Sequence, residues 1–163
     1  PKIIISKVSG AAIAGGCGIM TASDIIFATD ESRFGYPEVK IGFIPALVST
    51  ILISKINETK TRELLLTGKI INAKEAYKIG LIHYFYHEDD INNEILKFIQ
   101  HFTKTTSSKS IQRTKKIMYD TLQLDNKLNK AAEFNAKSRM EDDFKKGVNA
   151  FLKKEIINWN NNI

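Results

Sequence analysis

A segment of very small residues, residues 9–18, constrains the fold of this chain more than any other feature of its sequence. It reads SGAAIAGGCG and carries glycine at positions 10, 15, 16 and 18. Residues without bulky side chains let the backbone approach another group closely. β-branched apolar runs flank the segment at residues 2–8 and 25–29, and each predicts a buried strand. With a short helix expected at residues 17–23, the pattern predicts a strand, a glycine-rich turn, a helix and a second strand.

The glycine segment matches neither of the nucleotide-binding motifs that such a pattern suggests. A dinucleotide-binding turn needs G-x-G-x-x-G directly after the strand. Here GCGIMT at residues 16–21 lacks the third glycine and starts too late. A phosphate-binding Walker loop needs Lys and then Ser or Thr after its last glycine, whereas residues 10–16 are followed by Cys17 and Gly18.

Two interpretations of the glycine segment remain open. In the first, the glycines only let a helix pack closely on a sheet. In the second, unpaired N–H groups at a helix N-terminus donate to a carbonyl oxygen that gains negative charge, and so form an oxyanion hole. The segment holds no G-x-S-x-G elbow, and no histidine precedes His83, so Cys17 has no nearby base in sequence and we do not expect an acyl-enzyme mechanism.

The remainder of the chain predicts further helices and one more clear strand. Residues 32–42 form an expected turn-rich loop around Pro37, and Pro45 starts a helix at a favoured first-turn position. Helical spacing and cap residues predict helices at 46–56, 59–67, 73–79, 90–104, 108–123, 126–139 and 141–154, with extended pieces at 70–71 and 81–86. The sequence therefore predicts an α/β front part followed by an α-helical tail.

Length and composition narrow the class of protein. The 163 residues suffice for one domain with a substantial core. No run of 18 apolar residues occurs, so we expect no membrane span, and the single cysteine indicates a reducing compartment, which we take to be the cytoplasm. The three histidines are too dispersed to predict a metal site. Because the sequence begins at Pro1 rather than at Met, we expect that an N-terminal part is missing.

The positive charge of the chain lies in its rear part. From residue 104 to residue 154 there are 13 basic and 6 acidic side chains, a balance of +7, whereas residues 1–103 hold 11 of each. Only 4 of the 24 basic residues are Arg, and aromatic residues do not alternate with them, which disfavours nucleic acid as a partner. A solvated helical face and a phosphate-bearing small ligand both remain compatible with this charge.

Glu38 is the candidate acid–base residue. It follows the rigid Pro37 and lies in a loop otherwise poor in acids, between Phe34 and Ile41. A carboxylate in apolar surroundings has its pKa raised toward neutrality, which suits general acid–base catalysis. The alternative is an ordinary glutamate on a solvent-exposed loop.

Four stretches of the sequence resemble the enoyl-CoA hydratase/isomerase (crotonase) family. They are SGAAIAGGCGIMTASD at 9–24, SRFGYPEVKIGFIPA at 32–46, ELLLTGKIINAKEAYKIGLIHYFY at 63–86 and EDDFKKGVNAFLKK at 141–154. The resemblance covers the whole chain in order. It implies that residues 1–88 form the C-terminal part of a spiral core of ββα units and that residues 89–163 form a helical region that mediates trimerisation.

The same resemblance implies a set of site residues. Gly15 matches the glycine whose N–H is one oxyanion donor, and the second donor belongs to an N-terminal half that this sequence does not contain. Glu38 matches the catalytic glutamate. Gly18 stands where many hydratases have a second glutamate that helps to hold the attacking water. Phe151 and Lys154 match positions near the adenine end of coenzyme A, often contributed by a neighbouring subunit.

The resemblance implies an enzyme of fatty acid metabolism that acts on a coenzyme A thioester and keeps no cofactor bound permanently. We expect an enoyl-CoA hydratase, because a segment similar to PALVST at 45–50 occurs in a hydratase subgroup. Gly18 keeps two alternatives open: an isomerase that works with one glutamate, and a non-catalytic or truncated assembly partner of the same fold. The family also implies a homotrimer or hexamer.

Overall fold

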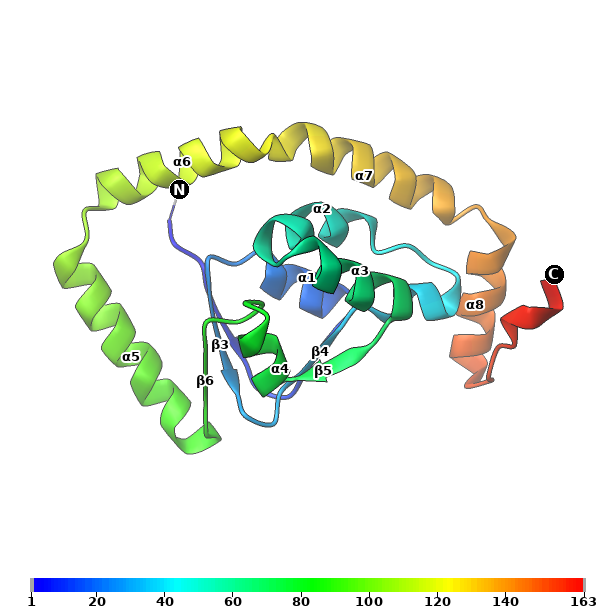
Figure 1. Ribbon diagram of the computed structural model, residues 1–163, viewed down its shortest axis with the longest axis horizontal. Helices are drawn as coiled ribbons and strands as arrows, with labels where there is room; N and C mark the ends of the chain where they lie inside the picture. The colour runs from blue at the N-terminus through cyan, green and yellow to red at the C-terminus, as the bar shows by residue number, and fades with distance from the viewer. Residues whose placement is uncertain (1, 163) are drawn as a thin grey trace.

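Two small three-stranded sheets form the centre of the structure, a computed structural model that describes residues 2–162 and the side chains of residues 2–160 (Figure 1). One sheet has the order β1–β3–β6 and is parallel throughout. The other has the order β2–β4–β5, with β2 parallel and β5 antiparallel to β4. The strands are β1 (Ile5–Val8), β2 (Ala11–Ile13), β3 (Ile25–Thr29), β4 (Arg33–Gly35), β5 (Ile70–Asn72) and β6 (Tyr84–Tyr86).

Short helices connect these strands in the front part of the chain. They are α1 (Gly15–Thr21), the 3-10 helix η1 (Pro37–Ile41), α2 (Ala46–Lys55), α3 (Glu58–Thr67) and α4 (Ala73–Lys78). Two helix ends lie where the sequence predicts them. Gly68 ends α3 in a left-handed conformation, and Asn72 caps the start of α4 in a reciprocal capping box with Glu75. One cluster of buried side chains joins both sheets to these helices; its largest members include Phe34, Tyr36 and Leu52.

Four long helices follow and form an arch around the front part (Figure 1). They are α5 (Glu88–Thr105), α6 (Ser108–Leu122), α7 (Leu124–Ser138) and α8 (Asp142–Lys153), after which the chain ends with the 3-10 helix η2 (Trp159–Asn162). α5 packs on the first sheet, where Phe98 contacts Phe27 edge to face at a centroid distance of 5.5 Å. α7 packs on α2, and α8 packs on η1. The tail therefore contacts the front part of the chain through α5, α7 and α8, and also through α6, where Lys115 pairs with Asp24.

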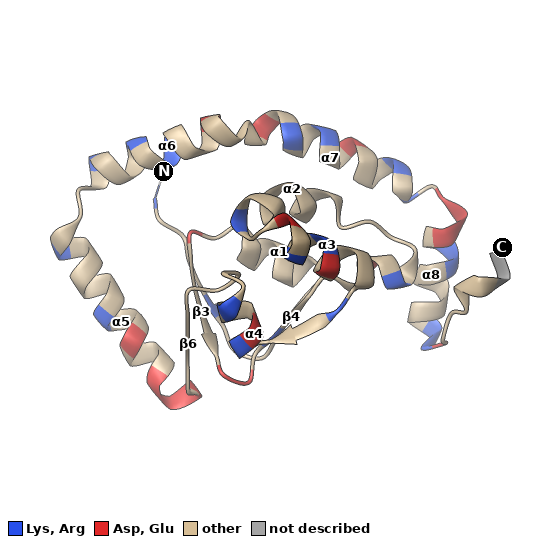
Figure 2. Cartoon of the chain, viewed as in Figure 1, with Lys and Arg blue, Asp and Glu red and all other residues tan. Residues whose placement is uncertain are grey.

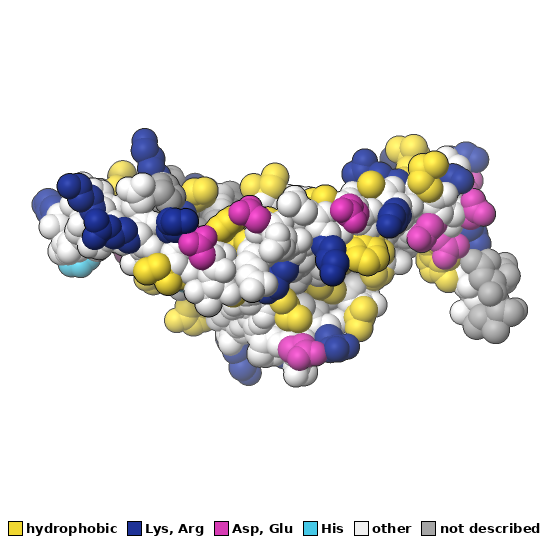
Figure 3. All heavy atoms as spheres, turned by 90° about the horizontal axis from the view of Figure 1, so that it is seen from above, with side chains coloured by type: hydrophobic (Ala, Val, Ile, Leu, Met, Phe, Trp, Pro, Cys, Tyr) yellow, Lys and Arg dark blue, Asp and Glu magenta, His cyan; other side chains and the backbone are white. Residues whose placement is uncertain are grey.

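The surface of the arch mixes charged and apolar side chains. Lys and Arg recur along α6, α7 and α8, as the charge distribution of the sequence predicts (Figure 2). Seen from above, hydrophobic side chains are scattered among these charged ones (Figure 3). No helix within residues 2–162 has the length and apolarity needed to cross a lipid bilayer.

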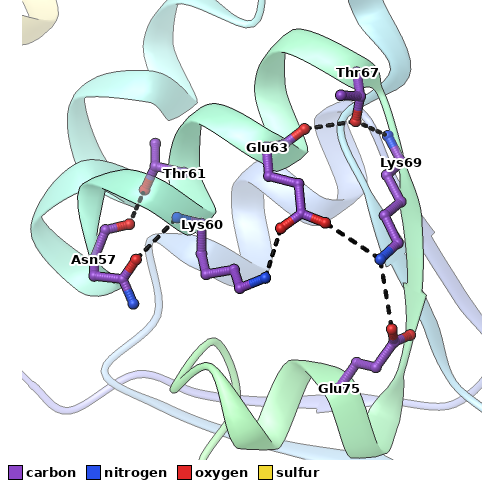
Figure 4. Close-up of polar contacts among 7 residues, drawn as sticks. All are labelled: Asn57, Lys60, Thr61, Glu63, Thr67, Lys69 and Glu75. Atoms are coloured by element: carbon purple, nitrogen blue, oxygen red, sulfur yellow. Dashed lines mark hydrogen bonds and ion pairs between the residues drawn. The ribbon is translucent and has the colours of Figure 1, made fainter.

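The front part also holds a network of ion pairs that links α3, Lys69 just before β5, and α4 (Figure 4). The Glu63 carboxylate lies 2.6 Å from the Lys60 ammonium and 3.3 Å from that of Lys69, and Lys69 lies 3.6 Å from Glu75. Hydrogen bonds from both lysines lower the pKa of Glu63. These side chains are largely exposed, so we assign the network a structural role in joining the two helices to the strand.

Two sequence-based assignments are corrected by the structure. Residues 32–42 are not a loop, because β4 and η1 form within them, and the glycine segment contains the strand β2. Both strands have only three residues and contain small or polar side chains, so local propensity does not reveal them; the ladder between Ala12 and Phe34 forms through tertiary pairing. The helices and the other strands occur where predicted, with ends shifted by a few residues. The division of the chain at residues 88 and 89 stays a prediction.

Candidate active site

The parallel pairing of β2 with β4 brings the glycine turn and the glutamate turn together. Ile13 is the register partner of Gly35, and the Ala14 amide donates to the Gly35 carbonyl at 2.9 Å. Parallel strands end at the same edge of a sheet, and the segments that follow them meet there. Gly15 follows β2 by two residues and Glu38 follows β4 by three. The sheet therefore places both predicted site residues at one edge.

Gly15 presents a free backbone amide at the start of α1. The preceding Ala14 has φ 51° and ψ −123°, a conformation that a residue with a side chain rarely adopts, and it turns the chain sharply from strand into helix. The first amides of a helix have no acceptor within the helix. In the described part of the chain neither the Gly15 nor the Gly16 amide donates a hydrogen bond, and a Cβ added at either would meet nothing within 4 Å. The space beside the Cα atoms of both glycines is therefore open.

Glu38 carries a half-buried carboxyl group, in which a hydrogen bond to the residue's own backbone only partly offsets the effect of burial. Within residues 2–162 its Oε2 is buried and makes no hydrogen bond. Burial raises the pKa of this carboxyl above its ordinary value. Its backbone is fixed by η1, where the Phe43 amide donates to the Glu38 carbonyl at 3.0 Å. The backbone that carries the side chain is thus fixed, and one carboxyl oxygen is left without a hydrogen bond.

One cavity contains the predicted catalytic residues. It has a volume of about 470 Å³ and is lined by Gly15, Gly18 and Glu38. Most of the remaining wall is apolar, with side chains from η1, α2 and the segment between them, such as Ile44 and Val48. The only other polar side chain in this wall, among the residues described, is that of Asn135 from α7.

Sequence reasoning did not find Asn135. It lies in a charged, amphipathic helix, and nothing in the local sequence says that α7 crosses over α2. Only the helix packing places this amide group at the cavity.

Gly18 lines the same cavity and leaves room for a side chain. A Cβ built on it would lie 3.8 Å from the Val48 Cβ, an ordinary van der Waals distance. A side chain at position 18, where the family resemblance implies a second glutamate in many hydratases, would start at the wall of this cavity. In this chain Gly18 contributes only backbone to that wall.

Cys17 lies beneath the cavity and is inert. Its side chain is fully buried, and burial raises the pKa of the thiol to about 11. A reactive cysteine needs a thiolate, which this environment disfavours. The expectation that Cys17 is not a nucleophile agrees with its surroundings. The described residues also contain no group of three or more His, Cys, Asp or Glu side chains that could hold a metal ion.

The structure does not bring Phe151 and Lys154 to this cavity. Phe151 is 67% exposed near the end of α8, and Lys154 follows the helix in a left-handed conformation with φ 57°. Neither lines the cavity that holds Glu38. Their role in binding coenzyme A stays a prediction.

α8 packs closely against the turn that carries Glu38, and two glycines make this close contact possible. A Cβ on Gly147 would lie 2.0 Å from the Ile41 carbonyl oxygen, and one on Gly42 would lie 2.4 Å from the Asp143 carbonyl oxygen. Beside them the rings of Phe43 and Phe144 are 4.9 Å apart. Backbone contact this close is possible only without side chains, so both glycines fix α8 against η1 and hence the position of Glu38.

The arrangement can polarise a carbonyl group and move a proton next to it. Free amides at Gly15 would stabilise an oxygen that gains negative charge, and Glu38 would give or take the proton. The apolar wall excludes water from bound substrate and strengthens both interactions.

Comparison with known proteins identifies the family to which this fold belongs. The family model of enoyl-CoA hydratase/isomerase matches residues 1–162, and the chain belongs to this family. It is 35% identical over 156 residues to a putative enoyl-CoA hydratase of Thermus thermophilus, covering 94% of the chain and 61% of that protein. It is also 36% identical over 104 residues to a short-chain-enoyl-CoA hydratase of Clostridioides difficile, covering 63% of the chain and 66% of that protein.

The fold has the same relatives. The crystal structure of carnitinyl-CoA hydratase from Mycobacterium avium superposes with a TM-score of 0.88 at 26% identity, over 97% of this chain and 62% of that chain. The expected crotonase-like α/β fold is thereby confirmed. The chain spans about three fifths of the length of such relatives.

Removing the charge of Glu38 is expected to stabilise the fold. A carboxyl whose pKa is raised by folding binds its proton more tightly in the native state, so native stability falls as pH rises through its pKa and stays lower at neutral pH. Glu38→Gln should therefore unfold at a higher temperature than the unmodified protein at pH 7. The gain should vanish below the ordinary pKa of glutamate. A variant that is less stable at pH 7 would contradict the burial of this carboxylate.

The glycine contact between η1 and α8 is tested by comparing Gly42→Ala with Gly80→Ala. Both glycines have positive φ, but a Cβ at Gly80 meets nothing within 4 Å. An alanine forced into the left-handed backbone conformation costs about 1–2 kcal/mol. Both variants should lose this much free energy of unfolding in chemical denaturation. Gly42→Ala should lose roughly 1–3 kcal/mol more through overpacking against α8. Equal losses in both variants would show that the contact is not tight.

Proposed function

We propose that the protein is an enoyl-CoA hydratase that adds water across the double bond of a 2-enoyl-CoA thioester. The observation that supports this most is the buried, unpartnered Oε2 of Glu38 in the same cavity as the free amide of Gly15. The substrate carbonyl would accept a hydrogen bond from Gly15, with a second donor supplied by the part of the protein outside this chain. The names of the relatives support the same substrate class.

In this mechanism one carboxylate serves both proton transfers. Glu38 takes a proton from water while the water oxygen bonds to C3 of the substrate, and the electrons of the double bond move toward the thioester carbonyl. The resulting enolate oxygen is stabilised by the amide of Gly15. Glu38, now a carboxylic acid, returns the proton to C2. The net change is the addition of one water molecule.

An isomerase is the second candidate, and Gly18 favours it. With no second carboxylate at this position, Glu38 alone could remove a proton from C2 of a 3-enoyl-CoA and deliver it to C4. The cavity wall provides no other carboxyl group among its described residues. A non-catalytic assembly partner is the third candidate. Against it, the partly buried carboxylate of Glu38 destabilises the protein, and a protein without activity would gain nothing from it.

We also propose the finer properties that the family implies. The coenzyme A moiety would contact Phe151 and Lys154 of a neighbouring subunit, which agrees with their exposure and with the basic charge of the tail. The protein would form a homotrimer or hexamer, act in fatty acid metabolism in the cytoplasm, and keep no cofactor bound permanently.

Glu38→Gln should slow turnover strongly. The full-length protein is assayed by loss of the 2-enoyl-CoA absorbance, and the variant should be about 10²- to 10⁴-fold slower because it cannot transfer a proton. In the unmodified protein the rate should fall as pH decreases through the raised pKa of Glu38, since the base must be ionised. Glu31→Gln, an exposed carboxylate in the neighbouring turn, serves as the control and should retain full activity. Activity that survives Glu38→Gln would exclude this mechanism.

Gly18→Glu separates hydratase from isomerase chemistry. Because a Cβ at this position makes only ordinary van der Waals contact with Val48 and Gly18 lines the cavity, we expect the variant to place a second carboxylate next to the attacking water. We expect the ratio of the hydration rate to the isomerisation rate to rise by roughly tenfold to a hundredfold. This increase reaches at most the lower end of the usual effect of an acid–base residue. Gly18→Ala adds the Cβ without the charge and should change neither rate. Hydration no faster in Gly18→Glu than in Gly18→Ala would refute this role of the position.

A further inference from the structure

The groove between α1 and α2 extends beyond the candidate active site. The cavity that holds Glu38 follows one face of α1 from Gly15 to Ala22, and a second cavity of about 650 Å³ begins there. The two cavities share Ala22 and Ile51. Since α1 has seven residues that each rise by 1.5 Å, the second cavity begins about 10 Å from the amide of Gly15. An acyl chain of medium length would reach it.

Lys55 is one of the residues that line the second cavity. It lies four residues after Ile51 and so occupies the same face of α2. Its ammonium donates to the carbonyl oxygens of Thr21 at 2.9 Å and Ser23 at 2.6 Å. An ammonium has three protons, and these two bonds use two of them. Burial lowers the pKa of Lys55 to about 8, which means that its charge is poorly solvated.

The charges around Lys55 do not balance. Asp24 attracts it at a distance, but this carboxylate is already engaged with the Lys115 ammonium at 2.6 Å and with the Ile4 amide at 2.7 Å. Burial and the charge of Lys55 both lower the pKa of His83, so this side chain adds no compensating negative charge. Two cations and one carboxylate leave an excess of one positive charge in the cavity.

We propose that this cavity binds an anionic group at the far end of the acyl chain, so that the enzyme prefers enoyl-CoA thioesters that end in a carboxylate. This inference rests on the proposed function for the identity of the chain that occupies the groove. A poorly solvated cation gains most from an anion that enters with the ligand. The hydroxyl groups of Ser110 and Thr114 also line the cavity and can donate to a carboxylate.

Lys55 also has a structural contact, since the carbonyls that it binds lie at the C-terminal end of α1. A cation there stabilises the helix end whatever the substrate. The experiment must therefore compare two ligands on the same variant, because a loss of helix stability affects both equally.

The test measures dissociation constants of two saturated acyl-CoA thioesters of equal chain length, one ending in a carboxylate and the other in a methyl group. The unmodified full-length protein should bind the carboxylated thioester more tightly. Lys55→Met should weaken this ligand alone, by roughly 10- to 100-fold, the usual value of a hydrogen bond to a charged group. Lys55→Arg should retain the preference, and Lys74→Met, which removes an exposed lysine of α4, should leave it unchanged.

Two results would overturn the proposal: no preference in the unmodified protein, or an equal loss for both ligands in Lys55→Met. Turnover of both matched enoyl-CoA thioesters, one ending in a carboxylate and one in a methyl group, is measured in parallel. Absence of turnover with both substrates would refute the proposed hydratase activity, while the ratio of dissociation constants would still decide the anion site.

Discussion

A carboxylate with one oxygen left without a hydrogen bond, held in an apolar wall beside free backbone amides, is the feature on which the rest of this structure depends. Leaving the Glu38 oxygen without a hydrogen bond costs stability, and the fold holds it there by rigid backbone contacts. η1 fixes one side, and α8 presses on the end of η1 through Gly42 and Gly147. The helical tail thereby holds in place the turn that carries Glu38.

The amides and the carboxylate meet because two short parallel strands end side by side. Gly15 lies just after β2 and Glu38 just after β4, and the hydrogen bond from the Ala14 amide to the Gly35 carbonyl links the two turns directly. The strained φ of Ala14 lies at this junction, and the amides of Gly15 and Gly16 that follow it donate no hydrogen bond within the described residues. Strain, an unpaired acceptor and unpaired donors occur together at one edge of the sheet, which is typical of a functional site.

The sequence predicted the parts of this site that depend on local chemistry. Glycine spacing indicated donors at the start of a helix, Pro37 and Glu38 stood out in an apolar segment, and Asn72 and Gly68 marked helix ends correctly. What it could not predict depends on long-range contact. β2 and β4 are too short to show a pattern, Asn135 reaches the cavity only because α7 crosses α2, and the close approach of Gly147 to Ile41 links residues over 100 positions apart.

The central claim concerns the ionisation of one side chain, and that ionisation can be observed directly. Carboxyl resonances of ¹³C-labelled glutamate are followed through a pH titration and assigned to Glu38 by their loss in the glutamine variant. Desolvation should make this carboxyl titrate above the ordinary range of glutamate. A Glu38 carboxyl that titrates with the exposed glutamates would contradict the account, because it would be solvated and could not serve as the base described here.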